Sequence, residues 1–551
     1  MRSTFAGLNT MVRGINSNRL SLDTVGHNIT NASTTGYSRQ SVNLSATASQ
    51  EIYSIYGSQQ VGTGVDSLSI LRARNVYADK QYWKENGTNS YYTTRQTNYD
   101  KVEAIYNDSD NNGIQNAMED FYKSWSELST SASTSSNRTS VVENGQVFTD
   151  RLQTAATQMQ SQIKANYDEL STEVDKVNNI TDQIVALNKN IASIEATGSN
   201  ANDLRDSRDN LVDSLSTYMN VNVYTEANGM YTIVSNGATM VGGISKLNLK
   251  LSTGTANDTY GVTDYDIQLA ETGTSFDAGS GSLKAEQDAI AEDKGYIDKM
   301  ANMAAFMMTT FNAQHKAGVG IDSDATTGTN FYGESGKAYI WDDTNQCVNV
   351  ASQTVSKTTT SGTTTVAVTT GAVSDTLKGV QIIKAMTVNS ALTATDGENL
   401  VAARGITYTT TDPSMYTTAN STNTYTMSSM NGTADGSNAT LMSTLFNCTK
   451  ENTGITTGDR SIGDVSLESY YNNAMSALGV DSEATTSKVT AQADILTQVS
   501  NWRSSTSGVN WNEELTNMLE FQKGFSACSR CLTTMDEMLD KLINSTGTVG
   551  R

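Results

Sequence analysis

Residues suited to acid–base or nucleophilic chemistry are scarce in this sequence. It has two histidines, His27 and His315, and they lie far apart in the chain. Neither H-E-x-x-H, typical of zinc proteases, nor G-x-S-x-G, typical of serine hydrolases, occurs. Carboxylates are so numerous that pairs of them single out no site. We therefore expect no catalysis, with both histidines on the surface or in packing.

The cysteines and glycines give no clear site either. Cys528 and Cys531 form one C-x-x-C, but zinc would need a second pair or nearby histidines. The other two cysteines, Cys347 and Cys448, complete no disulfide framework. The glycines in VGTGVDSLSIL (61–71) lack the third glycine of a dinucleotide loop. We expect no metal and no cofactor, and we interpret the C-x-x-C cysteines as small apolar helix residues.

Charge and hydropathy limit the possible partners. The 551 residues carry a net charge of −21, which disfavours nucleic acid and anionic membranes. No run of 18 apolar residues predicts a membrane span. The first residues lack the apolar segment and small-residue cleavage site of a secretory signal. An exported chain would therefore need a route that does not depend on a cleaved signal.

Apolar residues repeat in steps of three and four near both ends, which predicts helices with heptad seams. The C-terminal seam is the most regular in the chain. The N-terminal seam positions are Phe5, Leu8, Val12, Ile15, Arg19, Leu22, Gly26 and Ile29. The C-terminal seam positions are Met518, Phe521, Phe525, Cys528, Leu532, Met535, Leu539 and Leu542.

These end helices have two possible states. One apolar stripe on a single partner compensates poorly for the entropy of ordering a long segment, whereas burial among several neighbours compensates well. We therefore hypothesise that both ends are loose in the monomer and become ordered on assembly. The alternative is that the two ends pair with each other in a stable antiparallel hairpin.

The middle of the chain alternates between helical and strand patterns. Helical spacing predicts helices over 72–130, 141–195, 203–217 and 284–314. Alternation predicts strands near 42–46, over 61–71 and as hairpins from 221 to 251. The Thr-, Ser- and Gly-rich stretch 320–460 predicts solvent-facing strands, with partial disorder as the alternative. The single proline, Pro413, leaves long helices unbroken.

Together these patterns predict an α+β multidomain protein in which the chain goes out through helices, forms β domains and returns. Terminal heptad helices form a coiled-coil-like core domain, followed by a long-helix inner domain and β-rich outer domains. The predicted units are a terminal assembly domain (1–45 with 505–551), an inner helical domain (46–216 with 283–320 and 461–504), a β-rich domain (217–282) and a variable β insertion (321–460).

Several segments resemble one known family. The stretch GHNITNASTTGYSRQ (26–40) resembles the signature of flagellar rod, hook and hook-associated proteins, and its Tyr-Ser-Arg-Gln ending looks most like the hook-associated members. NDLRDSRDNLVDSLS (202–216), FNAQHKAG (311–318) and SGVN (507–510) are similar to further segments of that group, as is MDEML (535–539). Thr35 departs from the proline common in the turn, and 320–460 matches no segment of the family.

The resemblance implies a structural subunit at the junction between hook and filament of a bacterial flagellum, with no catalysis. It implies type III export without signal cleavage, an extracellular location on the flagellum and a homo-oligomeric ring. Its neighbours would be the hook protein and the second junction protein or flagellin. A cytoplasmic export chaperone would mask the C-terminal helix, whose apolar seam is otherwise an aggregation hazard.

The resemblance also gives residues roles. The expected assembly interface is Phe5, Leu8, Val12, Ile15, Leu22, Ile29, Met518, Phe521, Phe525, Leu532, Met535, Leu539 and Leu542. The expected elbow between terminal helix and outer domain is Asn28, Asn31, Gly36, Tyr37, Ser38, Arg39 and Gln40. Two alternatives stay open: another polymer subunit such as flagellin, and an enzyme or adhesin displayed by 320–460.

Overall fold

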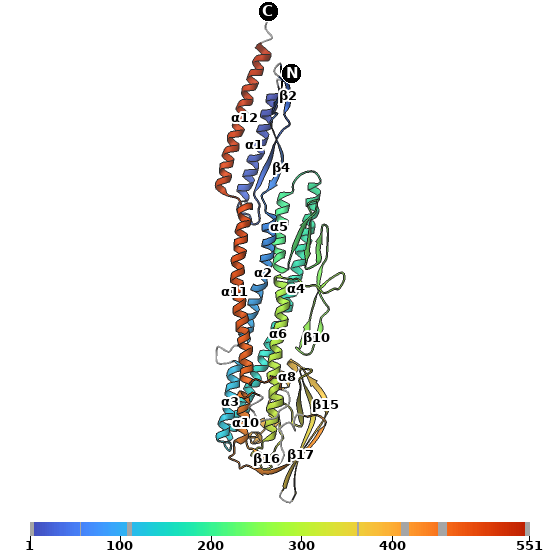
Figure 1. Cartoon of the computed structure of the whole chain (residues 1–551), viewed down its shortest axis with the longest axis vertical. Coiled ribbons are helices and arrows are strands. Elements are labelled where there is room, and N and C mark those ends of the chain that lie inside the picture. Colours follow the sequence, from blue (N-terminus) through green and yellow to red (C-terminus); the bar gives the residue numbers. More distant parts are fainter. Residues whose placement is uncertain are drawn as a thin grey trace, which may run out of the picture.

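The computed structural model describes residues 5–54, 57–106, 113–360, 363–408, 418–449 and 460–545. The molecule is a long rod with both termini at one end and the sheet that contains β15 and β17 at the other (Figure 1). The chain therefore goes out and returns along the rod, as the sequence predicts. Pro413 lies outside the described residues.

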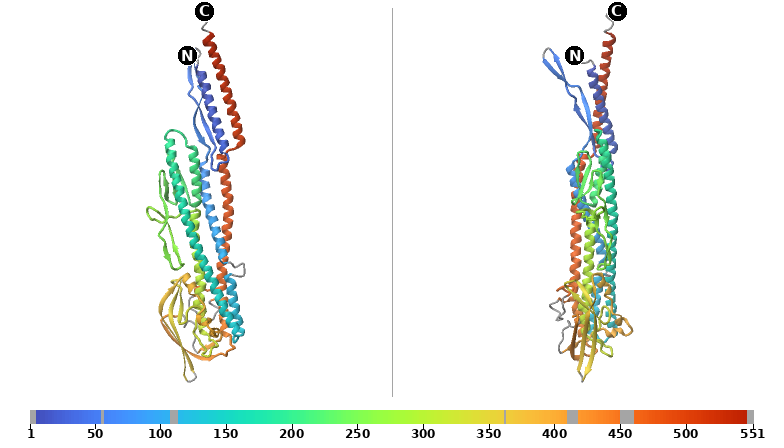
Figure 2. Two further views of the ribbon diagram at one scale, coloured as in Figure 1. Left: turned by 180° about the vertical axis from the view of Figure 1, so that it is seen from behind. Right: turned by 90° about the vertical axis from the view of Figure 1, so that its right-hand side faces the viewer.

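The two end helices lie side by side. Helix α1 (Ala6–Asn31) runs away from the N-terminus, and α12 (Trp511–Ser545) returns antiparallel to it (Figure 1). Strands β1 (Gln40–Ala46) and β4 (Val65–Arg72) pair antiparallel beside α1. Strands β2 (Gln50–Ser54) and β3 (Gly57–Val61) extend this ribbon, which bends away from the helices (Figure 2).

The glycine-kinked strand predicted over 61–71 is divided at its glycines. The strand expected over 61–71 is two strands, because β3 ends at Val61 and β4 begins at Val65. Gly64 lies between them with φ at +112°, a conformation that side chains other than glycine rarely adopt. The glycines therefore interrupt the strand, and the hairpin β2–β3 was missed because its residues are mostly polar.

Long helices form the body of the rod. They are α2 (Val76–Tyr106), α3 (Ile114–Thr130), α4 (Ser135–Glu195), α5 (Asn202–Tyr218), α6 (Gly281–Phe306) and α11 (Leu467–Ser507). The apolar seam predicted for α4 is buried along most of its length, including Leu152, Ile163 and Ile184. Helix α6 continues through a π-helical turn, η2 (Met307–Phe311), into α7 (Asn312–Ala317).

Small sheets lie along one side of the body. The first has the order β5-β6-β7-β8, from Asn222–Thr225, Tyr231–Ser235, Ala238–Gly242 and Ser245–Lys246. Two antiparallel ribbons follow: β9 (Leu249–Leu251) with β12 (Ile267–Leu269), and β10 (Thr255–Asn257) with β11 (Val262–Asp264). The hairpins predicted from 221 to 251 are present, and the turn of the first contains Gly229 at φ +79°.

The distal end holds a five-stranded antiparallel sheet in the order β13-β14-β15-β17-β16. Its strands are β13 (Lys337–Asp342), β14 (Cys347–Thr360), β15 (Thr363–Leu377), β16 (Ile406–Tyr408) and β17 (Ser421–Met430). The same stretch forms α8 (Val380–Ala385), α9 (Ser390–Thr393), the 3-10 turn η3 (Gly397–Leu400) and α10 (Ser437–Asn447).

The stretch 320–460 thus contains the predicted strands, but it also forms helices and contributes to the main core. Besides these helices, Phe331, Tyr332 and Phe446 of this stretch are buried. Their rings meet Phe121 of α3 at centroid distances of 5.5, 6.1 and 5.5 Å. Their burial was not predicted because these few aromatic residues are surrounded in the sequence by many threonines and serines.

Candidate assembly surface and elbow

Small residues let the two end helices approach closely. A Cβ at Gly14 would lie 3.0 Å from Sγ of Cys528, and a Cβ at Gly524 would lie 2.6 Å from Oδ1 of Asn18. A Cβ at Gly7 would lie 3.1 Å from Sδ of Met535. The contacts Gly7–Met535, Gly14–Cys528 and Asn18–Gly524 follow each other in opposite directions along the two helices. They therefore belong to one antiparallel register. The alternative of paired ends is thus realised in the single chain.

The C-terminal seam faces α1 but is incompletely covered. Met518, Phe521, Phe525, Cys528, Leu532, Met535 and Leu539 are all half-buried. Leu542 is 57% exposed. Among the described residues of α12, Glu514 is the only one that is buried. Pairing with α1 therefore leaves much of this apolar stripe open to solvent.

The N-terminal seam lies on a different face of α1 from the one that contacts α12. The contact face carries Gly7, Gly14 and Asn18, and on a helix with about 100° per residue the seam is centred roughly 100° away from it, with Ile29 nearest to that face and Phe5 farthest from it. Phe5 is 55% exposed and Val12 is 43% exposed. The other apolar seam residues are half-buried: Leu8, Ile15, Leu22 and Ile29. The structure does not bring the two apolar seams face to face.

A third face of α1 contacts the β1–β4 ribbon. Nη1 of Arg13 lies 2.9 Å from Oδ1 of Asp66, and the Ser67 hydroxyl donates to the Ser17 hydroxyl at 3.2 Å. These contacts are polar. Of the apolar residues of α1, only Val25 is buried. The ribbon and α12 thus bury small and polar residues of α1, and its apolar seam is covered only in part.

Asn28 is the centre of the elbow. Its side chain is buried and its Nδ2 donates to the Gln40 carbonyl at 2.8 Å and to Oε2 of Glu514 at 3.0 Å. Its Oδ1 accepts from the Tyr37 hydroxyl at 2.8 Å and from the Gln40 amide at 2.9 Å. One amide side chain therefore joins α1, the turn after it and the start of α12. Burial raises the pKa of Tyr37 well above its ordinary value, which keeps its hydroxyl protonated as a donor.

The turn after α1 has its own supports. Asn31 Nδ2 donates to the His27 carbonyl at 3.0 Å, which closes the last turn of the helix. Gly36 has φ at +76°, and a Cβ there would lie 1.7 Å from Oδ1 of Asn210 on α5. Only glycine fits this position, because both the backbone conformation and the neighbouring side chain exclude a larger residue.

Residues 38–40 connect the elbow to the body of the rod. The Ser38 amide donates to Asp206 at 2.9 Å and its hydroxyl donates to the same carboxylate at 2.8 Å. Gln40 Nε2 donates to Asp203 at 2.8 Å. Arg39 donates from Nη1 to Glu513 at 2.8 Å and from its amide to the Ser507 carbonyl at 2.8 Å. The motif thus contacts both α5 and the break between α11 and α12.

The sequence analysis missed an ionic network directly beneath the elbow. Arg72 lies 2.6 Å from Asp206 and 2.8 Å from Asp209, and Arg503 of α11 lies 2.8 Å from Asp79 and 2.7 Å from Asp213. Arg74 completes it at 2.9 Å from Asp79. Two sequence patterns could have indicated this network: the arginines at 72 and 74, and the aspartates of α5, which recur at steps of three and four.

Electrostatics in this network follow burial and pairing. Burial alone would raise the pKa of Asp209, but the guanidinium groups of Arg74 and Arg72 hold it below its usual value. Burial dominates at Asp213 and raises its pKa in spite of Arg503. The network therefore holds α2, α5 and α11 together through charge pairs that solvent reaches poorly.

The two histidines lie in separate environments. His27 Nε2 lies 3.4 Å from Asp203 at the surface, and His315 is buried with Nδ1 2.8 Å from the Thr329 carbonyl. Within the described ranges, no three His, Cys, Asp or Glu residues lie close enough to hold a metal, and no helix there could cross a membrane.

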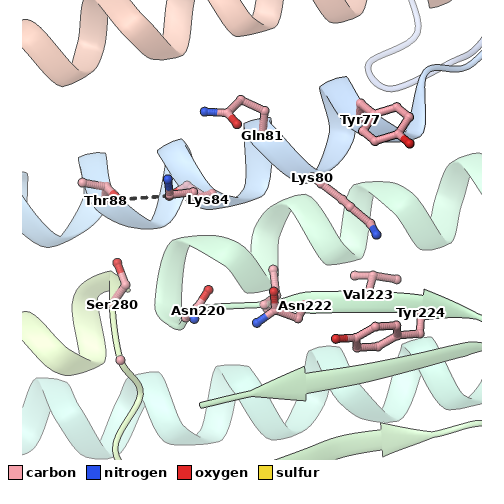
Figure 3. A pocket seen from close by; sticks show the side chains of 12 residues that line it. Tyr77, Lys80, Gln81, Lys84, Thr88, Asn220, Asn222, Val223, Tyr224 and Ser280 are labelled. Atoms are coloured by element: carbon pink, nitrogen blue, oxygen red, sulfur yellow. Dashed lines mark hydrogen bonds between the residues drawn. The ribbon is translucent and has the colours of Figure 1, made fainter. Parts of the chain in front are cut away.

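A groove of about 600 Å³ between α2 and β5 is lined by polar and aromatic side chains (Figure 3). Lys80 and Lys84 project from α2, and the Tyr224 ring lies below them with its centroid 5.9 Å from Nζ of Lys80. Its lining residues include no carboxylate, histidine or cysteine. The groove therefore offers positive charge and hydroxyl groups without a carboxylate or histidine in its lining.

Two family models and several known proteins match this chain. The model of the flagellar hook-associated protein FlgK helical domain matches residues 99–332, and that of the flagellar basal body rod FlgEFG protein C-terminal region matches 503–545. Flagellar hook-associated protein 1 of Bacillus subtilis is 28% identical over 100% of both chains. The Escherichia coli protein of that name is 24% identical over 98% of this chain and 99% of its own.

A solved structure has the same fold. The flagellar hook junction protein FlgK of Burkholderia pseudomallei superposes with a TM-score of 0.56 at 16% identity. It covers 78% of this chain and 100% of its own. The α+β fold of that structure is thus shared with the larger part of this chain.

Proposed function

Because the chain belongs to the family of flagellar hook-associated protein 1, we propose that its unburied terminal seams are the surfaces through which it builds the junction between hook and filament. Its role in the flagellum is structural. The proposal is carried by one observation: both terminal seams stay partly open, since Phe5 and Val12 of α1 and Leu542 of α12 are exposed and the other apolar seam residues are only half-buried.

Copies of the chain provide the missing cover. Apolar surface removed from water contributes about 25 cal/mol per Å², and an exposed stripe of this length gains that stabilisation only from a neighbour. Both seams keep solvent-exposed area on the terminal pair, so a subunit can contact neighbours through each of them. Repeated around an axis, such contacts close into a ring. The hook protein on one side and the second junction protein or flagellin on the other are the proposed neighbours.

The elbow sets the direction in which the terminal pair leaves the body. Asn28, Tyr37 and Gln40 join α1 to α12, whereas Gly36 and Ser38 pack the turn against α5. We assign these residues, with Asn31 and Arg39, the role of holding the assembly helices at one angle in every copy. A ring of identical subunits requires such a fixed angle.

Before assembly the seams need protection. We propose that a cytoplasmic chaperone covers the α12 seam, and that export through the flagellar type III apparatus leaves the N-terminal segment in place. The free monomer then holds the terminal pair weakly, and assembly orders it. Hydrogen exchange on the monomer tests this: protection of 515–542 as strong as that of α4 would refute it.

Charge placed in the seam should block assembly. Leu532→Asp or Phe525→Asp buries an unpaired carboxylate in every subunit contact, so hooks should form without filaments while the body stays folded. The matched control is Gln522→Asp, which adds the same charge at an exposed position of the same helix. Electron microscopy of complemented deletion strains and circular dichroism of the purified variants provide the two readouts.

The result can go against the proposal in two ways. Normal filaments and swimming with Leu532→Asp would mean that the seam is not the contact surface. Long filaments made of this chain alone, instead of a short collar at the hook tip, would assign it a filament role. No catalysis is needed for the proposed role.

A further inference from the structure

Three neighbouring strands of the distal sheet carry an ordered set of hydroxyl side chains on one face. The pairing register aligns Thr354 with Thr369 and Thr422, Ser356 with Ala367 and Thr424, and Thr358 with Thr365 and Thr426. We call these nine residues of β14, β15 and β17 the hydroxyl grid. Seven are threonine and one is serine, and Ala367 occupies the centre.

The grid is the outer face of the sheet. The residues between its members point to the other side, where Val366 and Val368 are fully buried and Met427 nearly so. Six grid residues are exposed: Thr354, Ser356, Thr358, Thr369, Thr422 and Thr424. In the part of the chain that the structure describes, the side chains of these six make no hydrogen bond. Their hydroxyls are thus free to bind a ligand.

The geometry of the grid is regular and stiff. Adjacent strands lie about 4.7–4.9 Å apart, and alternate residues along a strand lie about 6.6–6.8 Å apart. The register between β14, β15 and β17 has no bulge over these rows. Threonine is restricted at χ1 because it is β-branched, so each position presents a hydroxyl and a methyl with little entropy left to lose.

The chemistry of the face excludes most classes of ligand. None of the nine residues is charged, in a chain with net charge −21, so the grid has no cation to bind phosphate or acidic sugars. It has no Trp, Tyr or Arg, the residues that dominate protein–protein contacts, in which Ser and Thr are under-represented. It is part of a sheet face, and so suits an extended surface better than a small molecule.

We propose that the hydroxyl grid binds a neutral polysaccharide. A hydroxyl both donates and accepts hydrogen bonds, as sugar hydroxyls do, and the interleaved methyl groups match the C–H faces of a sugar ring. An extended chain of neutral sugars presents both at regular intervals along its length. The ligand lies across the strands, with its hydroxyls opposite the rows of the grid.

The position of the grid suits contact with the surroundings. The sheet lies at the end of the rod opposite to both termini (Figure 1). If the terminal helices form the assembled core, this end is the part of each subunit farthest from it. The proposal does not depend on the junction role, because it concerns a face that the terminal seams do not include.

Retention on insoluble polysaccharide tests the proposal. The full chain is incubated with microcrystalline cellulose and with chitin, and the bound fraction is measured after sedimentation, with immobilised heparin as the anionic comparison. We expect retention on at least one neutral polymer and none on heparin. Thr354→Val/Thr369→Val removes two paired hydroxyls at constant shape, and retention should fall at least tenfold.

The matched control is Thr359→Val/Thr364→Val, a cross-strand pair of the same two strands whose side chains lie on the opposite face. It should retain the wild-type binding, and circular dichroism should show both double variants folded. Absence of retention on both neutral polymers overturns the proposal. So does an equal loss in the two double variants, or self-association through the face that Thr354→Val/Thr369→Val abolishes.

Discussion

At the scale of single residues, the elbow depends on side chains that can donate and accept at once. Asn28 is the clearest example, because its amide group faces two acceptors and two donors. A carboxylate has no hydrogen to donate, so it could serve only the Oδ1 half of this arrangement. The identity of the residue is therefore set by its four partners.

Asn28→Asp should destabilise the terminal pair by about 1–3 kcal/mol, because it places a carboxylate against the Gln40 carbonyl and Glu514. Urea unfolding, with hydrogen exchange over 511–520 as the local readout, measures the loss. Asn16→Asp changes an exposed position of the same helix and should cost much less. Equal stability of the two variants would contradict the role given to Asn28.

Buried carboxyl groups between α2, α4 and α6 give the body a pH dependence. Burial raises the pKa of Asp293 to about 7, of Glu286 to about 7 and of Glu173 to about 6. Asp293 is fully buried and accepts hydrogen bonds from Asn98 at 2.9 Å and Asn166 at 3.1 Å. Between about pH 4 and 7 the folded state binds more protons than the unfolded state, so these groups lower stability as pH rises.

Asp293→Asn should remove part of this dependence. Relative to wild type, the variant should gain stability from pH 4 to pH 8, since each unit of pKa shift corresponds to about 1.4 kcal/mol. Thermal unfolding at the two pH values gives the comparison, and Asp168→Asn removes an equal charge from the exposed surface of α4. His315 has the opposite effect, because burial lowers its pKa to about 4, so only the difference between variants isolates Asp293. A constant difference at both pH values would contradict the assignment.

At the scale of elements, heptad spacing predicted that both ends are helical but not which face of α1 packs. The sequence shows where apolar residues lie, and it left open whether the two ends pair with each other or are buried among several copies. In the structure, glycines select the contact face instead, since the helices approach where side chains are smallest. That choice depends on the partner helix, and a local pattern contains no information about it.

Two glycines of α1 separate packing from helix propensity. Gly14→Ala adds a methyl group 3.0 Å from Sγ of Cys528, whereas a Cβ at Gly26 would have no neighbour within 4 Å. Gly26→Ala should therefore stabilise the monomer by about 0.5–1 kcal/mol through propensity. Gly14→Ala should lose that gain or reverse it. Chemical denaturation of the two variants measures their free energies of unfolding. An equal increase in both would refute the close contact at Gly14.

The ionic network under the elbow shows the same limit of sequence reasoning. Its charges come from three regions of the chain, around 72–79, 206–213 and 503. Each region reads as an ordinary charged surface when taken alone. Only the tertiary fold brings the arginines onto the aspartates, and burial then makes the pairs structurally important.

At the scale of the whole molecule, the sequence predicted an α+β rod whose chain goes out and returns. Long helices such as α4 could be predicted because their apolar residues recur at steps of three and four along a continuous segment. The distal stretch could not, because the aromatic residues that enter the core, such as Phe331 and Phe446, are isolated among polar neighbours. Their partners on α3 lie far away in the sequence.

The body should fold without the ends. The main hydrophobic core extends from Trp83 to Leu478 and includes no residue of the terminal pair. A chain reduced to residues 46–504 should therefore remain soluble and unfold cooperatively, but it should not complement a deletion strain. Circular dichroism, calorimetry and motility assays provide the test. A truncated chain that still built the joint would refute the assembly role of the ends.

The pairing of α1 with α12 also sets an order of events during synthesis. The hydrogen bond between Asn28 and Glu514 joins residues 486 positions apart. Helix α1 leaves the ribosome long before α12 and therefore waits for this partner, since contacts of such high sequence separation close late. A prematurely terminated chain lacks that partner altogether. The molecule thereby distinguishes complete copies from incomplete ones at the same surface that it uses to join its neighbours.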